Sequence, residues 1–183
     1  MTTPITETGT TTYAIDASHS QVGFSVKHMM FTTVRGVFNG FEGTIVVDHD
    51  NPVNSSVDVT IDASTITTGD LKRDEHLRSA DFFDVATYPT ITFKSTSLDF
   101  KDVEDFTILG ELTMHGVTES VKIKAEQTGE GTNPWGVDVV GFEGSTKINR
   151  KNFGLNWNAA LEKGGVLVGD EIKISLELQV AKQ

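Results

Sequence analysis

Strict alternation of apolar and polar residues is the feature that most limits what this chain can fold into. The clearest run extends from Glu171 to Val180, where every even-numbered residue is apolar and every odd-numbered residue is polar. A period of two predicts a β-strand with one dry face and one wet face. We therefore expect an all-β protein. The same alternation marks residues 22–26, 57–63, 90–94, 106–114 and 121–125.

Turn-forming residues separate these runs, with clusters at residues 48–52, 101–105, 128–136 and 162–165. Hairpins in series are the simplest connection, because each cluster lies between two apolar runs. They give about eight strands with one apolar face each. Closing these strands into a barrel removes exposed edges, whereas a sandwich keeps edges that need protection. Periodicity alone allows either architecture.

Two segments depart from simple alternation. Residues 33–48 contain three glycines, which predicts one sharply bent strand or two short ones. Residues 70–79 are the one plausible helix. Asp70 suits its N-cap, and Asp74 can pair with Arg78 at i, i+4.

Domain organisation follows from length and the lack of any repeat or linker. A chain of 183 residues and 19.9 kDa fits one domain, and roughly 70% of its unfolded surface can be buried. We expect a single domain over residues 13–183, preceded by a flexible N-terminal segment of residues 1–12. No stretch approaches the roughly 20 apolar residues of a membrane helix.

The charge balance excludes some partners. With a net charge of −11 and a pI near 4.8, the chain repels a phosphate backbone, so we expect no nucleic-acid partner. It also lacks the clusters of Lys and Arg that dock on anionic lipid surfaces. If a lipid is the ligand, it should enter the protein. The sequence leaves open whether the chain forms a homodimer.

Metal and catalytic sites are not predicted. The histidines stand in different segments, without HxH or HExxH spacing, so we expect neither a metal nor a cofactor. The sequence around Ser18 and Ser20 has no G-x-S-x-G elbow, which argues against a hydrolase. The histidines are His19, His28, His49, His76 and His115.

The first residues read MTTPITETGTTT and have neither a basic n-region nor an apolar h-region. We therefore expect a cytoplasmic location, or a periplasmic or secreted one if a leader was removed.

Several ordered motifs between Tyr13 and Val180 together resemble the YceI-like, polyisoprenoid-binding, lipocalin-like family. Tyr13 is a departure, since many relatives carry Trp there, and we expect little consequence because either aromatic can close a barrel end. The matching segments are residues 13–20, 22–28, 34–38, 61–69, 73–84, 88–95, 110–118, 141–150 and 153–154.

The resemblance implies an eight-stranded antiparallel lipocalin-like barrel with a short helix near its mouth. It also implies that the cavity binds, sequesters or transports a long-chain amphiphilic lipid of the polyisoprenoid or isoprenoid quinone type. One alternative is a small enzyme acting on a lipid-like substrate in the same cavity. Another is that the inward side chains fill a solid core, as they do in small barrels.

A lipid site needs a dry tube and a few polar groups that orient a headgroup. The lining candidates lie on the apolar parity of their strands: Val22, Phe24, Val26, Phe38, Val59, Ile61, Phe93, Ile108, Leu112, Met114, Val139, Ile174, Leu176 and Leu178. The headgroup candidates are Arg35, Arg73, His76, Arg78, Asp81 and Arg150, because an arginine fork can bind a pyrophosphate or an ester carbonyl.

The segment from Asp70 to Asp84 carries the densest charge of the chain. We expect it to cover one barrel end and to control ligand access, with Phe82 and Phe83 as its apolar underside. The alternative for its charged residues is a salt-bridged latch that holds the helix to the barrel.

Overall fold

The computed structural model describes residues 7–183. Within this range, eleven strands form one sheet: β1 (Thr10–Ile15), β2 (Gln21–His28), β3 (Thr32–Phe38), β4 (Phe41–Asp48), β5 (Ser56–Asp62), β6 (Ile66–Thr67), β7 (Thr90–Asp102), β8 (Asp105–Met114), β9 (Val117–Thr132), β10 (Asp138–Asn149) and β11 (Val168–Lys182). The helical elements are α1 (Leu71–Arg78) and the 3-10 turns η1 (Ala17–His19), η2 (Pro52–Asn54), η3 (Ala63–Thr65) and η4 (Arg150–Phe153). No helix among the described residues has the length and apolar character needed to cross a bilayer.

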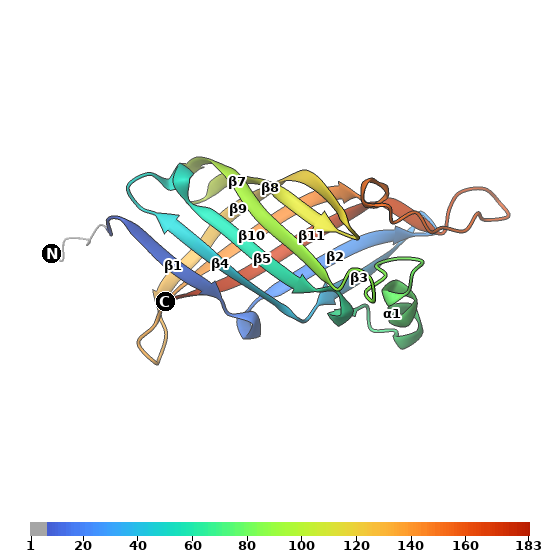
Figure 1. Ribbon diagram of the computed structural model, residues 1–183, viewed down its shortest axis with the longest axis horizontal. Coiled ribbons are helices and arrows are strands. Elements are labelled where there is room, and N and C mark those ends of the chain that lie inside the picture. The colour runs from blue at the N-terminus through green and yellow to red at the C-terminus, as the bar shows by residue number, and fades with distance from the viewer. Residues whose placement is uncertain (1–6) are drawn as a thin grey trace.

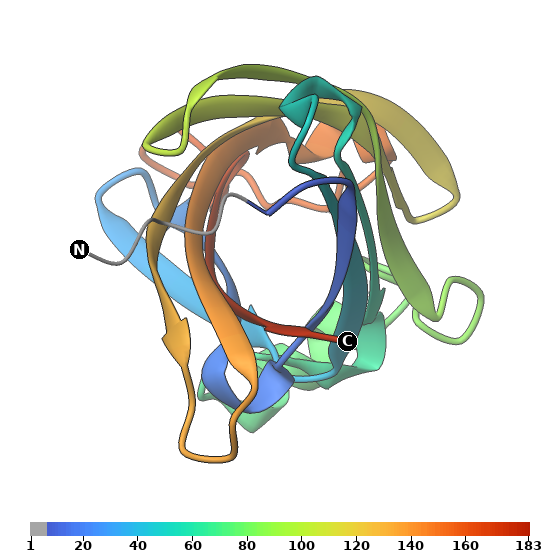
Figure 2. The ribbon, with the colours of Figure 1, turned by 90° about the vertical axis from the view of Figure 1, so that its left-hand side faces the viewer.

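The sheet closes into a barrel. Antiparallel pairs run in the order β1-β4-β5-β7-β8-β9-β10-β11, and β1 pairs with β11 to complete the ring. In this last pair Tyr13 lies opposite Lys182, and Ile15 lies opposite Val180. Figure 2 shows the molecule from the end at which β1 starts and the C-terminus lies. The expected eight-stranded antiparallel barrel is confirmed.

Three positions of the ring are each filled by two consecutive strands. At the first position β1 and β2 both pair with β11. At the second position β4 pairs with β1, and β3 pairs with β2. At the third position β5 pairs with β4, and β6 pairs with β3. The expectation of two short strands in residues 33–48 is confirmed, with the break at Gly40. A Cβ on Gly40 would lie 2.7 Å from the Thr65 Cγ2 atom, so only glycine fits where the chain passes η3.

The helix α1 has the expected cap but a different latch. The Asp70 side chain accepts a hydrogen bond from the Arg73 N–H at 3.0 Å. The expected Asp74–Arg78 ion pair is not among the pairs of the described residues. The buried Asp74 carboxylate instead accepts from the Thr68 N–H at 2.8 Å and the Thr68 hydroxyl at 2.6 Å. Burial alone raises the pKa of Asp74, but its hydrogen bonds together hold that pKa below the ordinary value.

The arginines of this helix also bind within the fold. The Arg78 guanidinium donates to the carbonyls of Ser64 at 2.7 Å and Ile66 at 2.8 Å, and Arg73 donates to the hydroxyl and carbonyl of Thr68 at 2.6 and 3.0 Å. All four acceptors are backbone carbonyl or hydroxyl oxygens. Hydrogen bonds rather than salt bridges therefore hold α1 to the barrel.

The barrel end beside α1 is packed. Ile66, Phe153 and Leu155 are 0%, 1% and 4% exposed, and Leu77 and Phe83 pack against the same cluster. Figure 1 shows α1 at the opposite end of the molecule from the start of β1 and the C-terminus. Residues 70–84 therefore help to close this end with apolar side chains.

The ordered chain begins before the expected domain boundary at residue 13. Residues 1–6 lie outside the described part, but the Gly9 N–H donates to the Asp50 Oδ2 atom at 2.8 Å. Thr10 already pairs with Asp48 of β4. Strand pairing with β4 thus fixes part of the segment that we expected to be flexible.

Arg150 is 2% exposed and ties the end of β10 to the following loop. Its guanidinium donates to the carbonyls of Gly169 and Trp157, both at 2.9 Å, and also to that of Leu155. One buried guanidinium thus supplies donors to several backbone carbonyls, so Arg150 stabilises the fold.

We predict that Arg150→Met lowers the free energy of unfolding by about 3 kcal/mol or more, because it leaves several buried carbonyls without a donor. Arg35→Met is the matched control. Arg35 is exposed on the outer face of β3, so this change should cost less than about 0.5 kcal/mol. Urea denaturation followed by circular dichroism measures both values, and equal losses would contradict the structural role of Arg150.

Candidate functional site

The barrel encloses a cavity of about 570 Å³. Inward residues of all eight positions of the ring contribute to its wall. Val59, Ile61 and Leu176 lie on this wall, yet each is only half-buried, because the opposing side chains do not meet across the barrel. The barrel therefore holds a void in the size range of small-molecule sites rather than a solid core.

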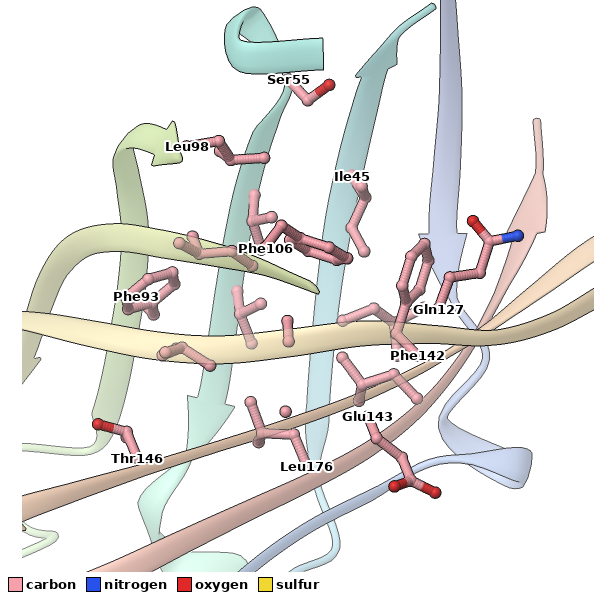
Figure 3. A pocket seen from close by; sticks show the side chains of 18 of the residues that line it. Ile45, Ser55, Phe93, Leu98, Phe106, Gln127, Phe142, Glu143, Thr146 and Leu176 are labelled. Atoms are coloured by element: carbon pink, nitrogen blue, oxygen red, sulfur yellow. The ribbon is translucent and has the colours of Figure 1, made fainter. Parts of the chain in front are cut away.

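The wall is almost entirely apolar. Figure 3 shows Phe93, Phe106 and Leu98 pointing into the same space as Ile45 and Leu176. All of the lining candidates except Val26 and Val139 lie on this wall: Val22, Phe24, Phe38, Val59, Ile61, Phe93, Ile108, Leu112, Met114, Ile174, Leu176 and Leu178. That these residues contact a ligand stays a prediction.

The placement of Val139 and Val26 needs correction. Val139 and Val140 are both valines, so alternation does not define which of them points inward, and it is Val140 that is buried and lines the cavity. Val26 has the inward parity, but it lies beyond the cavity. Its cross-strand neighbours Val34 and Ile172 do not line the cavity either.

Glycines on the inner face let aromatic rings lie flat against the wall. A Cβ on Gly36 would come within 2.4 Å of the Phe24 ring, and one on Gly110 within 2.4 Å of the Phe93 ring. Each ring therefore occupies the space that a neighbouring side chain would fill. This arrangement keeps the centre of the barrel open.

The cavity opens at the end where β1 starts and β11 ends. Val103 lines the cavity and is 50% exposed, whereas Met114 and Ile148, on the wall near α1, are 6% and 9% exposed. Most of the polar residues that line the cavity gather at this open end: Glu7, Asp48, His49, Ser55, Gln127 and Glu130. We call this group the mouth residues.

Sequence reasoning missed the mouth residues. Glu7 precedes β1, and Asp48, His49 and Ser55 lie in or next to the turn around η2, where no alternation marks an inward position. Gln127 and Glu130 lie near the end of β9, where the inward residues are polar. The sequence did carry one signal, the turn cluster at residues 48–52, which lies between two apolar strands.

Ion pairs hold the mouth together. The Glu7 carboxylate accepts from the Lys182 Nζ atom at 2.6 Å and lies 3.1 Å from the His49 Nε2 atom. The hydrogen bond from Lys182 is the main cause that lowers the pKa of Glu7. The Asp48 carboxylate accepts from the Asn51 N–H at 2.8 Å, which lowers the pKa of Asp48. Both carboxylates are therefore ionised at neutral pH.

None of the six headgroup candidates lines the cavity. Arg35 lies on the outer face opposite Ser25. The guanidinium groups of Arg73, Arg78 and Arg150 donate to acceptors within the fold, as described above. The reason for these three arginines is that backbone carbonyls accept from each guanidinium, and no sequence pattern shows where those carbonyls lie.

The remaining two candidates pair with each other near α1. The His76 Nε2 atom lies 2.8 Å from the Asp81 Oδ2 atom, and the His76 ring packs edge-on against Trp157 at 4.7 Å. None of residues 70–84 lines the cavity. The segment that we expected to control ligand access therefore lies at the packed end, opposite the mouth.

A Ser–His–Asp cluster does exist, but it lies outside the cavity. The His19 Nδ1 atom contacts the Asp16 Oδ2 atom at 2.7 Å and the Ser18 hydroxyl at 3.1 Å. A catalytic relay uses both ring nitrogens, one for each partner, whereas here a single nitrogen meets both. The hydrogen bonds from Ser18 and His19 instead lower the pKa of Asp16 to about 2 and cap η1. Within the described residues, no three His, Asp or Glu side chains gather as a metal site requires.

Comparisons with known proteins agree with this geometry. Protein YceI from Escherichia coli is 42% identical over 145 residues, which cover 78% of this chain and 75% of that protein. BcnA from Burkholderia cenocepacia superimposes with a TM-score of 0.78 at 26% identity, covering 90% of this chain and 98% of that chain. A polyisoprenoid binding domain from Saccharophagus degradans shares the fold, with a TM-score of 0.66 at 15% identity over 93% of this chain and 98% of that chain. Since a family model described as "YceI-like domain" also matches residues 13–180, this chain belongs to the YceI-like family.

Proposed function

We propose that this protein binds a long-chain amphiphilic lipid of the polyisoprenoid or isoprenoid quinone type inside the barrel, and sequesters or carries it without altering it chemically. The observation that carries the proposal is the apolar cavity of about 570 Å³ that opens at a polar mouth. An apolar tail gains free energy by leaving water for such a wall, in proportion to the area it buries.

The length of the cavity favours a chain over a compact metabolite. Its lining follows β8 from Phe106 to Met114. At a rise of about 3.3 Å per residue and a strand tilt of about 40°, this stretch spans roughly 20 Å along the barrel axis. A single extended tail fits a tube of that depth. The protein from Saccharophagus degradans that shares this fold is a polyisoprenoid binding domain, which supports the same class of ligand.

Mass spectrometry of the purified protein tests the proposal. Native spectra should show a mass shift of one amphiphile per chain, and solvent extraction should release that molecule intact. Stoichiometric cleavage products would instead favour an enzyme acting in the same cavity. A protein that carries no amphiphile and takes none up from added isoprenoids would contradict the proposal.

We predict that Leu112→Asp destabilises the fold by several kcal/mol and abolishes lipid retention, because it places an unpaired carboxylate on the dry wall. Leu109→Asp is the matched control on the same strand. Leu109 faces outward beside Lys122, so the change should cost less than about 1 kcal/mol and leave retention unchanged. Thermal melting and lipid extraction measure both effects, and equal behaviour of the two variants would refute the inward placement of Leu112.

We also predict that Val59→Trp lowers lipid occupancy while the protein stays folded. The added ring carries no charge and enters a void that no side chain fills. Occupancy is read from native mass spectra, and folding from the circular dichroism spectrum. Undiminished occupancy in a folded variant would place the ligand elsewhere.

A further inference from the structure

Carboxylates dominate the charge on the cavity wall. Glu7, Asp48, Glu130 and Glu143 line it, whereas no lysine or arginine of residues 7–183 does. His49 also lines it, but its Nε2 atom already lies 3.1 Å from the Glu7 carboxylate. The nearest cation at the mouth, Lys182, is already paired with Glu7 at 2.6 Å. An anionic headgroup entering here would leave water without meeting a free cation, which is unfavourable.

Tyr13 supplies a second, independent feature of the same mouth. It is 6% exposed and lines the cavity. Within residues 7–183 its hydroxyl has no hydrogen-bond partner and is not fully buried, so a ligand in the cavity that Tyr13 lines can reach it. Burial and then the Glu7 charge raise the pKa of Tyr13, so the hydroxyl stays protonated and can donate a hydrogen bond.

We propose that the mouth selects amphiphiles with an uncharged headgroup that accepts a hydrogen bond from the Tyr13 hydroxyl, and rejects phosphorylated headgroups. This inference rests on the proposed function and adds the chemistry of the headgroup to it. It also gives a role to Tyr13, whereas from the sequence we expected little consequence of a tyrosine in place of a tryptophan at this position.

Two ligands with the same tail test the selection. Geranylgeraniol and geranylgeranyl diphosphate share a C20 chain and differ in headgroup charge. Their affinities can be measured by displacement of the uncharged fluorescent probe N-phenyl-1-naphthylamine, which reports on the apolar wall. We expect the alcohol to bind at least about 10-fold more tightly, with a smaller ratio at high salt because salt screens the carboxylates.

A pair of charge variants separates the mouth from the total charge of the protein. Glu130→Lys places a cation at the mouth and should strengthen diphosphate binding by about 10-fold. Glu177→Lys makes the same change on the exposed outer face of β11 and should leave the ratio of the two affinities unchanged. If both variants change the ratio equally, selection comes from the net charge and the role of the mouth is overturned.

The Tyr13→Phe variant tests the hydrogen bond. It should weaken geranylgeraniol binding by about 3- to 10-fold, the range of one net hydrogen bond, with probe binding unchanged. Unchanged alcohol affinity in a variant that binds the probe normally would overturn the role of Tyr13.

The outcomes distinguish this inference from the proposed function. Equal affinities of the alcohol and the diphosphate, or tighter binding of the diphosphate, would overturn the inference and leave lipid binding intact. Displacement of the probe by neither ligand would overturn both.

Discussion

The pairing of the first strand with the last is the constraint on which the structure depends. β1 and β11 meet through a few residues, among them Tyr13 opposite Lys182 and Ile15 opposite Val180. This contact turns an open sheet into a ring with no free edge at that seam. It also fixes the geometry of the mouth, because Tyr13 and Lys182 are themselves part of the seam. Closure and ligand selection therefore depend on the same residues.

The two ends of the barrel differ in chemistry. At one end Ile66 and Phe153 are fully buried, and the guanidinium of Arg150 satisfies the carbonyls of the adjoining loop. At the other end carboxylates line the cavity together with Tyr13, whose hydroxyl has no partner within residues 7–183. The proposed amphiphile would therefore bind with its tail toward the packed end and its headgroup at the mouth. The acidic mouth and the apolar wall act on different parts of the same ligand.

Much of the fold follows from the sequence because strand parity is a local property. The alternation that ends at Val180 and the Asp70 cap of α1 each depend on a few neighbouring residues. Parity fails where two valines stand together, as at Val139. The partners of Arg150 could not be predicted, because the backbone carbonyls of Leu155, Trp157 and Gly169 carry no residue-type signal. The mouth was missed for a related reason, since Glu7 and the turn residues meet only after the barrel closes.

Methyl NMR spectroscopy tests the central claim, that the ligand lies within the barrel. Geranylgeraniol would be titrated into protein with labelled methyl groups. The account predicts that the signals of Leu112 and Ile174, on the cavity wall, shift and saturate at one ligand per chain. The signals of Met30 and Val166, which are 64% and 39% exposed near the packed end, should stay in place. Shifts confined to Met30 and Val166, with the wall unaffected, would contradict the account.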